Sequence, residues 1–289
     1  MSMKLHTFTI DPSAEKGRLL SLTRRMLPEI PEYMLREAFQ KRDVKVNGVR
    51  VGLDAAVVPG AEVKLYTRDL QPKHPLVPII YEDANVLIAV KPAGVSCEPD
   101  AKGGKTLTQL LSMQKPNLLC EPLLCHRLDN PTEGLIVLAK TPQAQQILQD
   151  AFRNHRVHKE YTCVVLGTPS PAHAVLEHYL IKDARNARVH VTPYQSRDAK
   201  QIITEYTVLQ KGECARLKVR LHTGRTHQIR AHLAFIGHPL LGDDQYGDRE
   251  ANKRYKARRL MLCSTRLAFE LDGPLNHLNG IEFSCTPSF

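Results

Sequence analysis

The sequence predicts an α+β protein in which a mixed, largely antiparallel β-sheet with flanking helices follows a small α/β module. Three observations lead to this prediction. Short β-like runs outnumber helical patterns, the two kinds of pattern do not alternate regularly, and 42% of the 289 residues are hydrophobic, which is enough to bury a core. We expect the module at residues 1–68, a linker at 69–75 and the larger domain at 76–289.

The module is predicted from two helical patterns that precede a hairpin. Apolar residues recur at helical spacing in two segments, and Pro31 suits the first turn of the second one. Asn47-Gly48 lies between two alternating runs, and this dipeptide favours a type I′ turn because both residues tolerate positive φ angles. The expected elements are helices at 17–27 and 31–42, a hairpin at 44–51 and a strand at 61–66.

The larger domain is expected to begin after a linker. The segment DLQPKHP at 69–75 contains two prolines and alternating charge, which is typical of a connecting segment. Short β-like runs then predict strands, and apolar residues at helical spacing predict helices. The expected strands are 85–90, 134–140, 159–167, 203–210 and 215–222, and the expected helices are 106–113, 142–154 and 226–237.

The charge balance indicates a polyanionic partner. The chain has 40 Lys and Arg against 30 Asp and Glu, and residues 249–259 hold six basic side chains against one acid. Nucleic acid is the first candidate, although a basic but otherwise ordinary surface remains the alternative. No run approaches the roughly 18–20 apolar residues of a membrane helix. Seven cysteines without a C-x-x-C pair predict a reducing, cytoplasmic environment with buried thiols.

The first candidate for chemistry lies in the stretch LLCHRLDNPTEGLIVLAK, residues 123–140. Asp129 follows His126 and Arg127 and precedes Pro131, so we expect it in a loop that leads into a strand. A carboxylate close to a cation stays ionised and can act as a base or a nucleophile. A surface Arg–Asp pair explains the same fragment, and both interpretations remain open at this point.

The second candidate stretch covers residues 221–250. We expect Thr226 to cap a helix that Gly237 ends, Arg230 to lie one turn inside it, and Gly224 to bend the chain ahead of it. Four histidines fall in this region, but steps of five and six residues do not keep ligands on one helical face, so we expect no metal site. These histidines are 222, 227, 232 and 238.

Several ordered motifs together resemble those of the RluA-type pseudouridine synthase family. They are H-R-L-D with T-x-G-L-x-x-L-A-K, then K-x-Y, T-G-R-T-H-Q-I-R-x-H-L and G-H-P-x-x-G-D-x-x-Y-G, and they span about residues 80–270. The first module resembles the RNA-binding module named after the fourth protein of the small ribosomal subunit. The resemblance implies a catalytic β-sheet domain that isomerises uridine to pseudouridine in structured RNA. Large-subunit ribosomal RNA is the substrate that we expect. We expect no cofactor and no metal, and a monomer with no membrane attachment.

The resemblance also implies roles for individual residues. Asp129 matches the essential aspartate, Arg230 the arginine that pairs with it, and Tyr161 the tyrosine that packs on the flipped target base and assists proton removal. Arg127 matches the arginine that fills the space left by that base, and Lys91, Pro92 and Gly94 match the K-P-x-G loop. We expect RNA contacts from Arg127, Arg225, Lys91, Arg24, Arg25, Arg36, Lys41, Arg42 and Lys45. Glu133 and Cys97 depart from the family pattern, which bears on the choice of target.

Three alternatives remain beside this interpretation. The first is a pseudouridine synthase that acts on transfer RNA. The second is a catalytically idle RNA-binding or ribosome-assembly factor, which the presence of Asp129, Tyr161 and Arg230 disfavours. The third is a phosphate-ester hydrolase that uses the acids of residues 243–248 with a divalent ion, although we expect those acids to cap a turn or to pair with Arg249.

Overall fold

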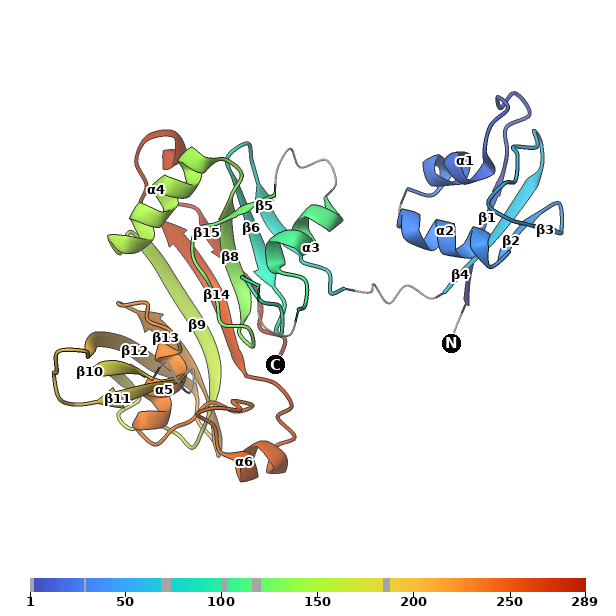
Figure 1. The fold of residues 1–289 in the computed structure, drawn as a ribbon. Helices are drawn as coiled ribbons and strands as arrows, with labels where there is room; N and C mark the ends of the chain where they lie inside the picture. The colour runs from blue at the N-terminus through green and yellow to red at the C-terminus, as the bar shows by residue number, and fades with distance from the viewer. Residues whose placement is uncertain (1–2, 29, 69–73, 100–102, 116–120, 184–187) are drawn as a thin grey trace. The chain divides into compact units, whose positions relative to one another are not determined.

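The computed structural model divides into two compact units, residues 1–73 and 74–289, which are described separately (Figure 1). It describes residues 3–28, 30–68, 74–99, 103–115, 121–183 and 188–289. Residues 69–73 of the predicted linker lie outside the described residues.

The first unit contains two helices packed on a four-stranded antiparallel sheet. The predicted type I′ turn is confirmed, because Asn47 and Gly48 have φ angles of 48° and 84° and join two paired strands. Leu19, Leu35 and Phe39 of the helices are fully buried in its core. The sheet order is β1-β4-β2-β3, with β1 (Met3–Thr9), α1 (Leu19–Met26), α2 (Glu32–Gln40), β2 (Val44–Val46), β3 (Val49–Val51) and β4 (Glu62–Arg68).

The second unit is built on one large sheet, in which eleven strands can be described. Its main path is β11-β10-β12-β13-β9-β14-β8-β6-β5, and β7 and β15 pair with β8 and β14. Only the β14–β8 pair among these is parallel, so the prediction of a mixed, largely antiparallel sheet is confirmed. The strands are β5 (Ile79–Glu82), β6 (Val86–Lys91), β7 (Leu123–Leu124), β8 (Glu133–Ala139), β9 (Val157–Leu166), β10 (His173–Asp183), β11 (Arg188–Thr192), β12 (Lys200–Gln210), β13 (Cys214–Leu221), β14 (Leu262–Phe269) and β15 (Glu282–Ser284).

Helices cover both faces of the central strands. Every residue of β8 is buried, and alternate residues point to opposite faces as a strand requires. Ile136 packs into the core formed with α3 and α5, whereas Val137 packs into the core formed with α4 and η1. The helical elements are α3 (Leu107–Gln114), α4 (Pro142–Arg153), α5 (Gln228–Phe235), α6 (Arg249–Arg254) and the 3-10 turn η1 (Gly273–Leu278).

A glycine permits the parallel contact between β8 and β14. Gly134 has a φ angle of +114°, and a Cβ atom there would lie 2.3 Å from the carbonyl oxygen of Ser264. Only glycine fits such a close backbone approach. Because residues 125–132 lead directly into β8, this contact also fixes the end of the loop that carries Asp129.

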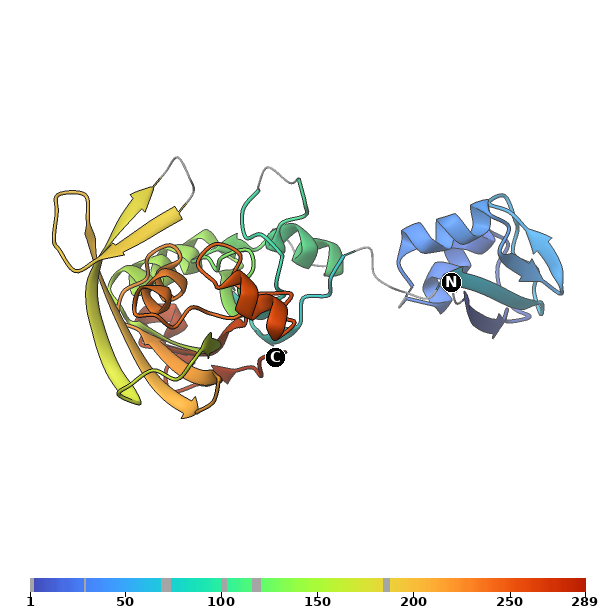
Figure 2. The same ribbon diagram turned by 90° about the horizontal axis from the view of Figure 1, so that it is seen from below.

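Several elements were not predicted from the sequence. The strands β1, β5, β10, β11, β14 and β15 and the helix α6 were missed. Strand β10 illustrates the reason: it carries His173, Glu177 and Lys182 near the edge of the sheet, where only one strand lies beyond it, so its apolar alternation is weak. The β10–β11 pair (yellow) lies at one edge of the unit in Figure 2. No helix among the described residues is long and apolar enough to span a bilayer.

Candidate active site

The three residues expected to carry the chemistry line one cleft of about 890 Å³. Asp129 comes from the loop before β8, Tyr161 from β9 and Arg230 from α5, so the cleft lies where the loop, the sheet and the helix meet. The expected RNA contacts Arg127 and Arg225 also line this cleft and are exposed. Segments that lie far apart in the sequence therefore form one site.

Arg230 is the central charged group of the site. It is 2% exposed, and its guanidinium donates two hydrogen bonds to Asp243, at 2.7 and 2.8 Å. The expected pair with Asp129 is present at a longer distance, 3.6 Å from Nη1 to Oδ2. Burial alone would lower the pKa of Arg230, but the hydrogen bonds and charge of Asp243 raise it above the usual value. Asp243, more than Asp129, therefore fixes the orientation of the guanidinium.

Asp243 lies in a tight turn after β13 and α5. Burial tends to raise its pKa, but the hydrogen bonds and charge of Arg230 lower it overall, so it is a carboxylate. Its Oδ1 also accepts the backbone N–H groups of Gln245 and Tyr246. Gly242 precedes it at a φ angle of +74°, and a Cβ atom there would lie 1.7 Å from the carbonyl oxygen of Arg259. This close approach sets the position from which Asp243 reaches Arg230.

The acids that follow Asp243 have separate roles. Asp248 caps α6 by accepting the N–H of Ala251 at 2.8 Å, as the sequence predicted for this run. The expected pairing with Arg249 is not found among the described residues. Within those residues, no cluster of three or more His, Cys, Asp or Glu side chains is placed to hold a metal ion.

Two polar groups in the cleft are held in their neutral forms. Burial, with the charge of Asp129, raises the pKa of Tyr161, so its hydroxyl stays protonated at neutral pH. Burial lowers the pKa of His126 to about 3, and its Nε2 accepts the N–H of Val137 at 3.2 Å. The ring of His126 also stacks on Phe152. His126 therefore supports the loop and is not a proton carrier in the neutral range.

Basic side chains line the cleft around Asp129. Arg127 is exposed and paired with Glu98 at the surface, so it remains accessible to a phosphate. Lys159 lies 5.5 Å from the centre of the Phe152 ring, and burial lowers its pKa. Lys182 of β10 also lines the cleft and is exposed. The site thus combines the Asp129 carboxylate with a wall in which basic side chains predominate.

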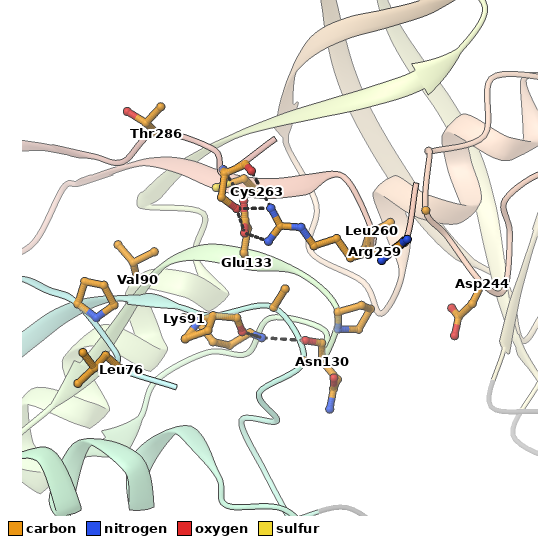
Figure 3. Close-up of a pocket in the computed structure, with 18 residues that line it drawn as sticks. Leu76, Val90, Lys91, Asn130, Glu133, Asp244, Arg259, Leu260, Cys263 and Thr286 are labelled. Carbon is orange, nitrogen blue, oxygen red and sulfur yellow. Dashed lines mark hydrogen bonds and ion pairs between the residues drawn. The ribbon is translucent and has the colours of Figure 1, made fainter. Parts of the chain in front are cut away.

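Lys91 does not line this cleft, and its expected contact with RNA is wrong. Its side chain is fully buried, and its Nζ donates to the carbonyl oxygens of Pro92, Val95 and Asn130 at 3.0, 2.7 and 2.9 Å. Burial lowers the pKa of Lys91 to about 8. Figure 3 shows Lys91 in a second cavity, of about 610 Å³, with the bond to Asn130 drawn. Because Asn130 follows Asp129, the bond from Lys91 to the Asn130 carbonyl oxygen holds the loop that carries Asp129.

The two departures from the family pattern lie in different places. Glu133 lines the second cavity and accepts hydrogen bonds from Arg259, at 3.3 Å, and from the backbone N–H of Ser288, at 2.9 Å (Figure 3). Cys97 lines the cleft, and its thiol donates to the carbonyl oxygen of Leu128 at 3.6 Å. Neither side chain forms a hydrogen bond or ion pair with Asp129, Tyr161 or Arg230 in the described part of the chain.

The start of α5 differs from the sequence prediction. Thr226 does not cap the helix; the residue before its first turn is His227, which has no side-chain cap and a left-handed backbone, with a φ angle of 52°. Gly224 was expected to supply the bend, but it is His227 and not Gly224 that has the positive φ angle. His227 is thereby turned towards the cleft, which it lines.

The expected cations of the first unit lie on its surface. Arg24 and Arg36 both pair with Glu32, Lys41 pairs with Glu37, and Lys45 lies 5.7 Å from the Tyr66 ring centre. Arg25 and Arg42 are exposed and have no acidic partner among the described residues. Exposed pairs of this kind are weak, so they do not prevent phosphate binding.

Three residues of the site were not predicted as functional residues, namely Asp243, His227 and Tyr246. All three lie inside motifs that were recognised, T-G-R-T-H-Q-I-R and G-D-x-x-Y-G. One signal could have identified Asp243. A buried arginine on a helix requires a carboxylate partner, and the turn after Gly242 supplies one.

A carboxylate in a cleft with basic walls is typical of a protein that acts on polyanions. Comparison with known proteins identifies the class more closely. Residues 85–235 match the family described as RNA pseudouridylate synthase, and the chain belongs to this family. It is therefore a pseudouridine synthase, an isomerase, and not the phosphate-ester hydrolase considered as an alternative.

Similar proteins agree with this assignment, and a solved structure shares the fold. The chain is 32% identical over 251 residues to ribosomal large subunit pseudouridine synthase D of Xylella fastidiosa, covering 83% of this chain and 74% of the relative. It is 30% identical to synthase C of Vibrio vulnificus, covering 92% and 89%. The structure of human RNA pseudouridylate synthase domain containing 1 shares the fold, with a TM-score of 0.64, 23% identity and coverage of 76% and 87%.

Lys91→Met should destabilise the protein without removing an RNA contact. The substitution removes the Nζ donor from three carbonyl groups. Those of Pro92 and Asn130 keep a backbone N–H partner, whereas the buried carbonyl of Val95 loses its side-chain donor, and we expect the free energy of unfolding to fall by about 1–3 kcal/mol. Chemical denaturation measures this change. Lys105→Met, at an exposed position, is the control and should change stability by no more than about 0.5 kcal/mol. Weaker RNA binding by Lys91→Met with unchanged stability would contradict the structural role.

Proposed function

We propose that the chain converts specific uridines of large-subunit ribosomal RNA into pseudouridine, with Asp129 as the reacting carboxylate and the target base flipped out of the RNA. The observation that carries the proposal is the convergence of Asp129, Tyr161 and Arg230 on one cleft with basic walls. The choice of RNA is supported by the relatives, which are named ribosomal large subunit pseudouridine synthases C and D.

The reaction needs an anionic group at the junction of sugar and base. The bond between C1′ and N1 breaks, the uracil turns, and a bond between C1′ and C5 forms. The proton on C5 is then lost and N1 takes up a proton, so the product is an isomer of uridine. Asp129 lies in the cleft with its side chain 24% exposed. Attack on the sugar, attack on the base and removal of a sugar proton each require it as a free carboxylate. Arg230 places a positive charge 3.6 Å from that carboxylate.

Tyr161 and the cleft hold the flipped base. Removing a base from the stack of a folded RNA requires a few kcal/mol. Stacking on an aromatic ring returns about 1–3 kcal/mol per base, and Tyr161 is the tyrosine of the cleft. Its protonated hydroxyl can donate a hydrogen bond to the uracil or to a group that is losing a proton. Arg127 is close enough to the cleft to occupy the space that the base leaves.

Phosphate contacts at the edge of the cleft and beyond it help to orient the RNA. Arg225 at the cleft and the exposed cations Arg249, Lys253 and Arg254 of α6 suit contacts with the backbone, which add affinity without reading sequence. The first unit has exposed cations and none of the three residues of the cleft. We infer that it binds and selects the ribosomal RNA, whereas the second unit carries the reaction.

Asp129→Asn should abolish turnover and preserve RNA binding, because the change removes the charge and keeps the shape. We expect the rate to fall by at least about 10³-fold. Release of tritium from RNA labelled at C5 of uridine measures the reaction, and a filter-binding assay measures affinity. Asp150→Asn, on α4 and paired only with Arg153, is the matched control and should keep the full rate. Substantial release by Asp129→Asn would contradict the proposed role.

Removing residues 1–73 should separate targeting from catalysis. We expect the remaining unit to keep most of its activity on a short RNA stem-loop and to have much lower activity on full-length ribosomal RNA. The dependence of long-RNA binding on salt should also flatten, by about 0.7–0.9 in log–log slope for each phosphate that the shortened protein no longer neutralises.

The matched control for this truncation is a full-length chain with Arg25→Gln and Arg42→Gln. It keeps the fold of the first unit and removes two exposed cations, so it should reproduce part of the change in salt dependence. An equal fall in activity on both RNAs after truncation would mean that the first unit supports the catalytic unit and does not select the substrate.

A further inference from the structure

The carboxylate of Asp129 has no short hydrogen bond to the protein. Within the described residues, no donor lies within 3.5 Å of its oxygens; its two ion-pair partners are Arg230 Nη1 at 3.6 Å and His227 Nε2 at 4.0 Å. Arg230 has two of its donors committed to Asp243 at 2.7 and 2.8 Å. Arg230 alone therefore leaves the direction of the Asp129 carboxylate loosely defined.

His227 is the other group that faces Asp129. Its side chain lies between the cleft and Tyr246, with Nδ1 3.0 Å from the Tyr246 hydroxyl and Nε2 towards Asp129. Its left-handed backbone is uncommon outside glycine, and residues held in such conformations cluster at functional sites. The conformation therefore has a consequence at the cleft: it directs the imidazole towards Asp129.

The hydrogen bonds of Tyr246 favour the tautomer of His227 that carries its proton on Nε2. The Tyr246 oxygen accepts the backbone N–H of Val189 in β11 at 2.9 Å. The hydroxyl hydrogen then has one acceptor within reach among the described residues, namely Nδ1 of His227. A neutral imidazole that accepts at Nδ1 carries its proton on Nε2. The Nε2–H group therefore points at Asp129.

We propose that His227 is a positioning residue for Asp129, held by Tyr246 in the tautomer whose Nε2–H donates to the Asp129 carboxylate. This inference rests on the proposed role of Asp129 in the reaction. At 4.0 Å the contact is longer than a hydrogen bond, and catalytic hydrogen bonds of unliganded sites commonly tighten when substrate binds. Tyr246 also connects β11 to the active site, because the Val189 N–H, the Tyr246 hydroxyl and His227 form one chain of hydrogen bonds.

The charges around His227 favour the neutral ring. Burial lowers its pKa first, and the charge of Arg230 lowers it further, although Asp129, Asp243 and Asp244 act in the opposite direction. A neutral donor orients Asp129 without adding a second full positive charge beside it. The carboxylate then stays available for reaction, which a fully charged partner at short distance would oppose.

The tautomer can be measured on the full-length chain without RNA. In protein labelled with ¹⁵N in histidine, long-range proton–nitrogen spectra should show His227 as the neutral Nε2–H form. Tyr246→Phe removes the hydroxyl and keeps the ring, so it should give a mixture of tautomers or the charged ring. The Nδ1–H form in the wild-type protein would overturn the inference.

Rates with saturating RNA test the effect on the reaction. We expect His227→Leu and Tyr246→Phe to lower the single-turnover rate by about 10- to 100-fold, the loss typical of one hydrogen bond to a charged group. The dissociation constant for RNA should change by no more than about twofold. Glutamine can place an amide N–H near the position of Nε2, so His227→Gln should recover most of the rate. Tyr255→Phe, which removes a surface hydroxyl bonded to Glu213, is the control and should keep the full rate.

The outcomes separate this inference from the proposed function. If the wild-type protein releases no tritium, the proposed function is wrong, whatever the tautomer of His227. An active wild-type protein with equal rates for His227→Leu would overturn the positioning role alone. A loss of rate in His227→Leu that is accompanied by equal losses of RNA affinity and melting temperature, with no rescue by His227→Gln, would also overturn it, because a merely structural role predicts that pattern.

Discussion

The buried ion pair between Arg230 and Asp243 is the interaction on which the active site depends. Arg230 is 2% exposed and the side chain of Asp243 is fully buried, so neither charge is stabilised by water. A buried pair is tolerated only when its geometry is good and the remaining donors and acceptors are bonded. Both conditions hold, because two short bonds join the groups and Asp243 also accepts two backbone N–H groups.

Much of the site is arranged around this pair. The pair joins α5 to the turn after Gly242, and it places the guanidinium 5.2 Å from the centre of the Tyr246 ring. The same guanidinium has one nitrogen left to face Asp129. On the other side, Lys91 and the close contact at Gly134 fix the loop that carries Asp129. The Asp129 carboxylate thus lies between two supports that are themselves buried.

The sequence predicted those parts of the fold and site that local patterns or motifs encode. Asn47-Gly48 correctly predicted a turn. Strand β8 followed from a continuous apolar run, all of which is buried, and α4 followed from its helical periodicity, because one of its faces is buried. Asp129, Tyr161 and Arg230 were chosen by resemblance, and they line one cleft. Strand β10 was missed because its stability comes from neighbours in the sheet, which local alternation does not reveal.

Long-range packing decided the remaining features of the site. Lys91 was expected to contact RNA because it matches the K-P-x-G loop of the family, but its side chain is buried and donates to three backbone carbonyl groups. Asp243 was expected to belong to a turn, but in the structure it also binds Arg230 of α5. Neither contact follows from spacing along the chain, since 39 residues separate Lys91 from Asn130 and 13 separate Arg230 from Asp243.

The effect of Asp243→Asn on stability and rate tests most directly whether the active site depends on the Arg230–Asp243 pair. The substitution keeps the shape and leaves the Arg230 charge buried with a neutral partner, so the free energy of unfolding should fall by about 3–5 kcal/mol. The single-turnover rate of the remaining folded protein should fall as well. Asp244→Asn, 86% exposed and 3.4 Å from the same guanidinium, should change stability by no more than about 0.5 kcal/mol. Wild-type stability and rate in Asp243→Asn would contradict the central role of the pair.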